Sequence, residues 1–165
     1  QTDSGDAWGK PLHTAAAPSL DREEVAALLN SMVGPLLQTP PRFSAVKVRG
    51  KPLYWWTRRG VSQTVAPRQV EIFQMALVEV APQTIRCRID CSSGTYIRTL
   101  AETIAQRLGT VGHVAQLTRR AVGPWTIDSA HPLSWILSAD LIELRRALQP
   151  APTVPSVLHA HPHWS

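Results

Sequence analysis

Hydrophobic residues follow two successive patterns between residues 84 and 109. From Thr84 to Cys91 apolar and polar residues alternate, which predicts a half-buried strand. Ser92, Ser93 and Gly94 interrupt the alternation, and glycine can take backbone angles closed to other residues. From residue 97 to 108 the apolar positions recur at helical spacing, and Gly109 marks the end. The pattern predicts a strand that leads through a tight turn into a helix.

Two side chains suited to chemistry, Tyr96 and Arg98, lie at this junction. If the chain is still extended there, residues two apart point the same way. A phenol and a guanidinium would then face one pocket beside a helix N-terminus, which favours a carboxylate or a phosphate. The spacing fits equally well with Tyr96 in the core and Arg98 as a surface charge.

The rest of the pattern predicts an α+β fold, with a mixed, mainly antiparallel sheet flanked by helices. Ser19 is expected to cap the first helix, whose first turn is acidic. Gly34-Pro35 is expected to end it. The predicted helices cover residues 19–33, 53–59, 97–108, 132–137 and 139–148, a short helix or turn covers 113–120, and the predicted strands cover 43–48, 65–80, 84–91 and 121–127, with 65–80 and 84–91 forming an antiparallel hairpin.

Composition is that of an ordinary soluble domain, with 165 residues of which 44% are hydrophobic and 18% charged. No apolar run approaches the roughly 20 residues that span a bilayer, and the polar, acidic start does not resemble a signal peptide. We expect no membrane partner. Cys87 and Cys91 would lie roughly 13 Å apart on a strand, too far for a disulfide. Reduced core cysteines are typical of a cytoplasmic protein.

The formal net charge of +5 suggests a polyanionic partner. The densest basic cluster is followed directly by Tyr54, Trp55 and Trp56. Basic residues interleaved with aromatic ones suit phosphate contact and base stacking. The alternative is a solvated edge strand whose aromatic residues turn to the core. The cluster consists of Arg42, Lys47, Arg49 and Lys51.

Common catalytic motifs are absent: the sequence has no Walker loop, GxGxxG, HExxH, GxSxG or paired CxxC. Residues 150–165 are rich in proline and are expected to be a disordered tail after a domain of residues 1–149. His159, His161 and His163 alternate in this tail, and we interpret them as solvated residues rather than metal ligands. No metal site is predicted.

Three stretches together resemble one known family. They are QTPPRFSAVKVRGKPLYWWTRRG (38–60), CSSGTYIRTLAETIAQRLG (91–109) and HVAQLTRRAVGPW (113–125). They resemble the TruB family, the bacterial tRNA pseudouridine-55 synthases, which isomerise the T-loop uridine of tRNA. The opening QTDSGDAWG resembles the TDTxDxxG segment of that family. The resemblance covers about residues 1–135 and rests on the specific motifs PPxxSAxKxxGxxLY and GTYIR.

The sequence also departs from the family pattern. The catalytic aspartate of the family lies in a GTLDPxAxG segment upstream of TDTxD, and no such segment is present. The tyrosine-bearing strand before TDTxD is missing too, and the usual C-terminal RNA-binding PUA domain is absent or reduced to residues 150–165. We therefore expect the C-terminal part of a pseudouridine synthase catalytic domain, incomplete at its N-terminus. The nucleophile is assigned to none of the six aspartates, which are Asp3, Asp6, Asp21, Asp90, Asp128 and Asp140.

The resemblance implies roles for residues at matching positions. The target uridine is flipped out of the tRNA, with Tyr96 as the stacking face and a proton-transfer group. Arg98 pairs with the catalytic carboxylate supplied from outside these residues. Leu117 is an apolar wall against the base. No cofactor is implied, and the phosphates of the T arm are held by Arg42, Lys47, Arg119 and Arg120.

Two functions fit these residues. The first is a pseudouridine synthase that acts as a monomer, of which this chain alone is inactive. The second is a non-catalytic module that binds or folds tRNA. A generic basic domain without an RNA role fits the three motifs poorly.

Overall fold

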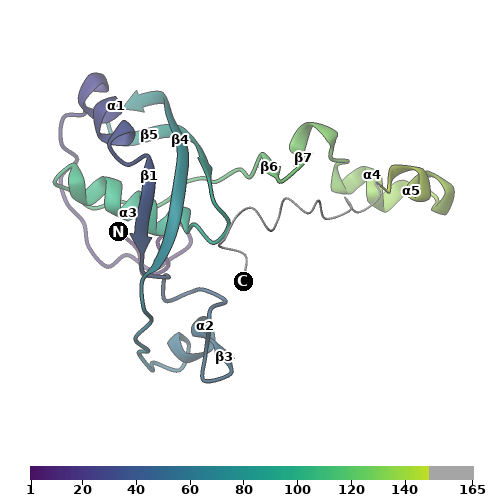
Figure 1. Ribbon diagram of the computed structural model, residues 1–165, viewed down its shortest axis with the longest axis horizontal. Helices are drawn as coiled ribbons and strands as arrows, with labels where there is room; N and C mark the ends of the chain where they lie inside the picture. The colour runs from purple at the N-terminus through teal and green to yellow at the C-terminus, as the bar shows by residue number, and fades with distance from the viewer. Residues whose placement is uncertain (149–165) are drawn as a thin grey trace. The chain divides into compact units, whose positions relative to one another are not determined.

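The computed structural model describes residues 1–148, in two compact units that divide between Leu117 and Thr118 (Figure 1). The first unit contains α1 (Arg22–Asn30), β1 (Gly34–Gln38), β2 (Lys47–Val48), β3 (Lys51–Pro52), α2 (Leu53–Thr57), β4 (Arg68–Ala81), β5 (Thr84–Cys91) and α3 (Ile97–Arg107). The second contains β6 (Ala121–Val122), β7 (Trp125–Thr126), a 3-10 helix (Ile127–Ser129), α4 (Leu133–Ser138) and α5 (Leu141–Ala147).

The main sheet has the order β1-β4-β5, and both pairings are antiparallel. Strands β4 and β5 form the long hairpin that the alternation predicts, and Gln38 at the end of β1 pairs with Arg68 at the start of β4. The predicted α+β class is confirmed, with helices packed on an antiparallel sheet.

One hydrophobic core joins α1, β4 and α3. It is formed by Val25, Leu29, Met32, Ile72, Met75, Leu100 and Ile104. Every second residue of β5, from Ile85 to Cys91, packs against this cluster, as its alternation predicts. Burial raises the pKa of the Cys87 thiol. Both cysteines are free and half-buried, which confirms the interpretation of them as core residues.

The first helix begins later than predicted because Asp21, and not Ser19, is its cap. Asp21 Oδ1 accepts the backbone N–H groups of Glu23 at 2.8 Å and Glu24 at 3.0 Å. Strand β1 was not predicted, since Gly34-Pro35 was interpreted only as a stop. Proline lacks a backbone donor, but Pro35 lies on an edge strand, where that loss is tolerated.

Three other predictions are corrected. Only Lys47 and Val48 of the predicted strand 43–48 pair, through a two-residue turn in which Arg49 (φ 50°) and Gly50 (φ 75°) have the positive φ of a type I′ hairpin. The predicted strand 121–127 is a tight hairpin of β6 and β7 around Gly123-Pro124. Residues 113–120 contain no helix.

The second unit holds the two short helices that the pattern predicts near its end. Asp140 caps α5 in a reciprocal capping box with Glu143. None of residues 118–148 is buried, so the apolar residues of α5 and its end, Leu141, Leu144 and Leu148, meet no core there. The predicted tail and its three histidines lie outside the described residues. Within residues 1–148, no helix has the length and apolar character needed to cross a membrane.

Candidate functional site

The junction between β5 and α3 is tied to the sheet on both sides of its turn. Ser92 donates its backbone N–H to the Glu71 carbonyl at 2.8 Å, and its hydroxyl accepts the Glu71 N–H at 2.9 Å. Gly94 has a φ of +79°, as the predicted turn requires. Tyr96 follows as the N-cap residue of α3, with extended backbone angles and a half-buried side chain. The predicted strand, turn and helix are confirmed.

The buried amide of Gln38 holds the backbone of Tyr96 from the end of β1. Gln38 Oε1 accepts the Tyr96 N–H at 2.9 Å, and Gln38 Nε2 donates to the Tyr96 carbonyl at 3.3 Å. Gln38 is only 3% exposed, so these bonds satisfy an amide that burial would otherwise penalise. Two residues 58 positions apart are therefore fixed together at the site.

Arg98 lies in the first turn of α3 and ties together two loops. Its Nη1 donates to the Ser4 carbonyl and its Nη2 to the Phe43 carbonyl, both at 2.8 Å. Its guanidinium also lies 3.5 Å from Asp6 Oδ2, with the Arg98 side chain 24% exposed. Gly5 faces this contact with a φ of +76°, and a Cβ there would lie 3.2 Å from Arg98 Cβ. The N-terminal loop thus requires glycine where it passes the arginine.

Asp6 is also part of this site, although no role was predicted for it from the sequence. Its Oδ1 accepts the Ser4 hydroxyl at 2.7 Å and the Trp8 N–H at 3.1 Å. The Ser4 hydrogen bond is the largest cause that lowers the pKa of Asp6, and Arg98 lowers it further, against a smaller opposing effect of burial. The carboxylate is therefore ionised and held in the loop.

The structure changes the geometric argument that linked Tyr96 to Arg98. Helix α3 begins at Ile97, so the backbone is extended at Tyr96 and helical at Arg98. The alternation of an extended chain therefore does not put the two side chains on one side. A shared substrate pocket for Tyr96 and Arg98 stays a prediction. The two residues are instead linked through the 38–43 loop, since one contacts Gln38 and the other contacts Phe43.

Arg42 and Lys47, the predicted phosphate contacts, are both exposed in the 38–48 segment. Arg42 carries the carbonyl that accepts the Thr57 hydroxyl at 2.8 Å. Leu117 is 58% exposed at the end of the first unit. Arg119 and Arg120 belong to the second unit, and both are exposed.

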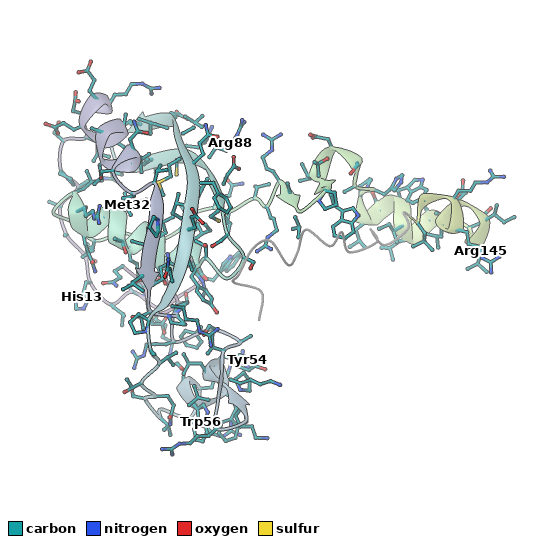
Figure 2. All side chains as sticks on the ribbon, in the orientation of Figure 1. His13, Met32, Tyr54, Trp56, Arg88 and Arg145 are labelled. Carbon is teal, nitrogen blue, oxygen red and sulfur yellow. The ribbon has the colours of Figure 1, made fainter. Side chains whose placement is uncertain are left out.

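The aromatic residues of α2, of which Tyr54 and Trp56 are labelled in Figure 2, fit in part the interpretation as an RNA contact and in part the alternative of rings turned inward. Trp56 donates its indole N–H to the Val48 carbonyl at 3.0 Å, which ties α2 to the β2-β3 hairpin. Trp55 meets Trp56 edge to face, and the Arg59 guanidinium lies 3.6 Å from the centre of the Trp55 ring. Tyr54 is 39% exposed beneath Arg58. The segment is therefore held by its own contacts and still presents cations and rings to solvent.

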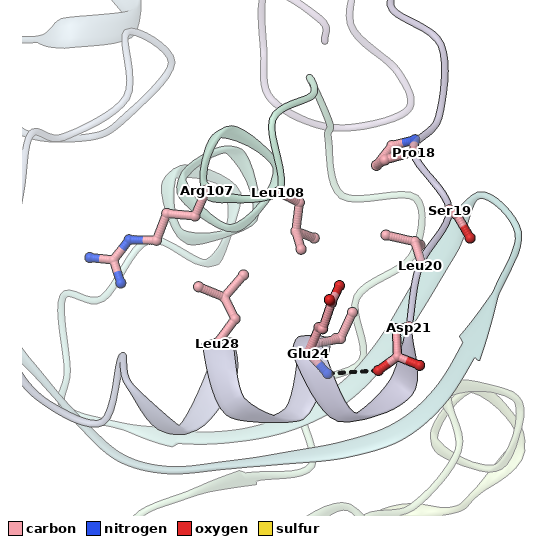
Figure 3. A pocket seen from close by; sticks show the side chains of 9 residues that line it. Pro18, Ser19, Leu20, Asp21, Glu24, Leu28, Arg107 and Leu108 are labelled. Atoms are coloured by element: carbon pink, nitrogen blue, oxygen red, sulfur yellow. Dashed lines mark hydrogen bonds between the residues drawn. The ribbon is translucent and has the colours of Figure 1, made fainter.

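A pocket of about 380 Å³ is formed by residues other than those of the site described so far (Figure 3). It is formed by the segment that leads into α1, one side of α1, and Arg107 and Leu108 at the end of α3. None of the predicted site residues lines it. Residues 1–148 contain no cluster of three or more His, Cys, Asp or Glu residues that could hold a metal.

Sequence reasoning missed Gln38, Asp6 and the carbonyl groups that Arg98 contacts. Only Gln38 left a local signal: in an alternating strand it takes the same face as Leu36, which packs on the core. A polar residue on a buried face needs a partner. Its partner lies 58 residues away, and the Ser4 contact of Arg98 spans 94, so local spacing could not supply either one.

Comparison with known proteins identifies one family, both by its family model and by individual relatives. The family model of the TruB family pseudouridylate synthases, N-terminal domain, matches residues 1–97. A protein of Hydrogenovibrio crunogenus named tRNA pseudouridine synthase B is 40% identical over 82% of this chain and 45% of its own length. Its namesake in Burkholderia mallei is 41% identical over 91% of this chain and 49% of its own length. The chain thus spans about half the length of these curated relatives.

Solved structures show a similar fold at lower identity. A Cbf5-Nop10-Gar1 complex matches with a TM-score of 0.61 and 22% identity, over 82% of this chain and 39% of the matched one. An H/ACA RNP bound to a substrate RNA matches with a TM-score of 0.57 and 17% identity, over 81% of this chain and 37% of the matched one. With the family model covering more than half of the residues, the chain belongs to the TruB family of pseudouridylate synthases.

Proposed function

We propose that this chain is part of an enzyme that isomerises the T-loop uridine of tRNA to pseudouridine. The proposal is supported by the position of Tyr96, whose backbone is clamped at the start of α3, in a member of the TruB family. The relatives named tRNA pseudouridine synthase B supply the substrate class.

The reaction needs positioning more than it needs a cofactor. The bond from ribose C1′ to uracil N1 breaks and a bond from C1′ to C5 forms, while C5 loses a proton and N1 gains one. Atoms and electrons balance without an oxidant, so no redox group is required. The protein has to expose the base, hold it while it turns, and move a proton.

Tyr96 is proposed as the stacking face for the flipped uracil, with its hydroxyl as a proton-transfer group. Stacking on an aromatic ring offsets part of the free energy spent in unstacking the base. The nucleophilic aspartate is proposed to come from outside these residues, because the sequence has no GTLDP segment. Arg98 pairs with that carboxylate while it holds the loops at Ser4 and Phe43.

The remaining predicted residues are proposed to hold the tRNA. Leu117 forms an apolar wall against the base. Exposed cations on both units contact phosphates of the T arm, since such contacts fix orientation without reading sequence. These cations are Arg42, Lys47, Arg119 and Arg120. In this proposal the protein acts on tRNA as a monomer in the cytoplasm.

The experiment uses T-arm tRNA that carries tritium at C5 of uridine, because tritium leaves only when C5 bonds to ribose. We expect the full-length gene product to release tritium and its Tyr96→Ala variant to lose nearly all turnover, with a smaller loss of tRNA binding. The control tRNA has cytidine at the target position. Turnover of Tyr96→Ala equal to that of the parent would remove Tyr96 from the site.

The same experiment separates the enzyme from a non-catalytic tRNA-binding module. A full-length protein that binds the T arm but releases no tritium would be such a module. In that case Tyr96→Ala would change binding alone.

A further inference from the structure

The two hydrogen bonds from Gln38 to the Tyr96 backbone suggest a role for Gln38, which is outside the set of predicted site residues. Gln38 is the last residue of β1, and its side chain lies on the side of the strand that faces the protein interior. It contacts the start of α3, where it bonds both backbone polar groups of one residue. A primary amide suits this task because it offers one donor and one acceptor side by side.

The backbone of Tyr96 needs such a partner. Tyr96 cannot cap α3 with its own side chain, and its N–H precedes the hydrogen-bonded turns of the helix. Its carbonyl accepts the Leu100 N–H at 3.0 Å, so the Gln38 Nε2 bond is a second bond to that oxygen. The Tyr96 N–H has Gln38 Oε1 as its acceptor. Gln38 therefore fixes the orientation of the Tyr96 backbone, from which the tyrosine ring projects.

We propose that Gln38 is a positioning residue for uridine isomerisation, which sets the orientation of the Tyr96 ring through its backbone. This inference rests on the proposed function of Tyr96. It assigns to Gln38 an effect on turnover rather than on tRNA affinity, because the amide is buried and contacts Tyr96 only through the main chain.

The test is a double-mutant cycle in the full-length protein, measured as tritium release from C5-labelled tRNA. Gln38→Met keeps the length of the side chain and removes both hydrogen bonds. We expect kcat to fall about 10-fold or more while KM for tRNA changes by less than about 3-fold. In the Tyr96→Ala background, where no ring remains to be positioned, the same change should cost no further turnover. Hydrogen exchange at the Tyr96 amide should become faster in Gln38→Met.

Two further variants separate positioning from folding. Gln38→Glu keeps the acceptor but turns an oxygen toward the Tyr96 carbonyl, so it should also lower kcat, and it replaces Gln38→Met if that variant does not fold. Gln69→Met, on the exposed side of β4, is the matched control and should turn over like the parent.

Each outcome decides the proposal. Parent-like kcat in both Gln38 variants, an equal loss in the Tyr96→Ala background, or unfolding of both variants would overturn the role of Gln38. A parent protein without tritium release would instead overturn the proposed function, and a fully active Tyr96→Ala would overturn the proposed role of Tyr96; the inference would fall with either.

Discussion

At the scale of single residues, the site depends on polar side chains that bond to the main chain. Gln38 and Arg98 each contact two backbone groups, and Asp6 accepts a backbone N–H. Such contacts fix where a loop runs without constraining what its side chains do. This arrangement holds the backbone of Tyr96 and the loop that carries Arg42 in place without using the side chain of either residue.

Asp6 gives this residue network a pH dependence. Its pKa is lowered in the folded protein, first by the Ser4 hydroxyl, so its carboxylate stabilises the fold at pH values above the unfolded pKa of about 3.9. That contribution is lost as the pH falls through the lower, folded pKa. We expect Asp6→Asn to lower the Tm at pH 7, and the difference from the parent to shrink as the pH falls below about 4.

The measurement is a series of thermal unfolding curves between pH 2 and pH 7. Asp128→Asn is the control, since Asp128 is exposed in the second unit and its variant should match the parent throughout. A Tm difference for Asp6→Asn that stays constant over the whole range would contradict the assignment.

Ser44 offers a second prediction at this scale. It is 5% exposed, and its hydroxyl has no hydrogen-bond partner among residues 1–148. A buried hydroxyl without a partner destabilises the fold by roughly 1–3 kcal/mol relative to a bonded one. We expect Ser44→Ala to leave the free energy of unfolding unchanged or to raise it, as measured by urea denaturation. A clear loss of stability would show that the hydroxyl has a partner in solution.

At the scale of elements, burial decided which parts of the fold were predictable. Strand β5 was predicted because its alternate residues face the core, and α3 because its apolar stripe does too. Strand β1 was missed because Gly34-Pro35 is a local stop signal, and only its pairing with β4 makes it a strand. The predicted strand at 43–48 is reduced to two paired residues because its partner β3 ends at Pro52, where α2 begins.

The N-cap of α1 is Asp21 and not the predicted Ser19, and this difference can be measured. Asp21→Ala removes the acceptor for two backbone N–H groups, so we expect a loss of about 1 kcal/mol in the free energy of unfolding. Ser19→Ala is a matched control, because Ser19 was the predicted cap and is exposed outside the helix. Urea denaturation of both variants tests this. Equal losses would indicate a shared capping role.

At the scale of the whole molecule, net charge determines the expected salt dependence of tRNA binding. The net charge of +5 and the exposed cations predict that tRNA binding weakens steeply as salt rises. Lys47→Ala and Arg42→Ala should each reduce the slope of log K against log salt by about 1. Glu23→Gln, at an exposed position of α1, is a control of opposite charge that should leave the slope unchanged. A slope unaffected by either basic substitution would remove these residues from the phosphate contacts.

The 165-residue chain by itself should release no tritium from labelled tRNA, because it has no GTLDP segment to supply the proposed nucleophile. The full-length gene product, tested beside it at equal concentration, serves as the positive control. Turnover by the 165-residue chain would place the nucleophile within the residues described above.

The hydrogen bonds of Arg98 also bear on which positions of the protein tolerate substitution during evolution. Its two shortest contacts end on the carbonyl oxygens of Ser4 and Phe43, which every amino acid possesses. As far as those contacts are concerned, mutation at either position is tolerated, while the arginine itself has no substitute because lysine cannot reach two acceptors with a planar fork. A deep mutational scan should therefore find position 43 permissive and position 98 nearly invariant.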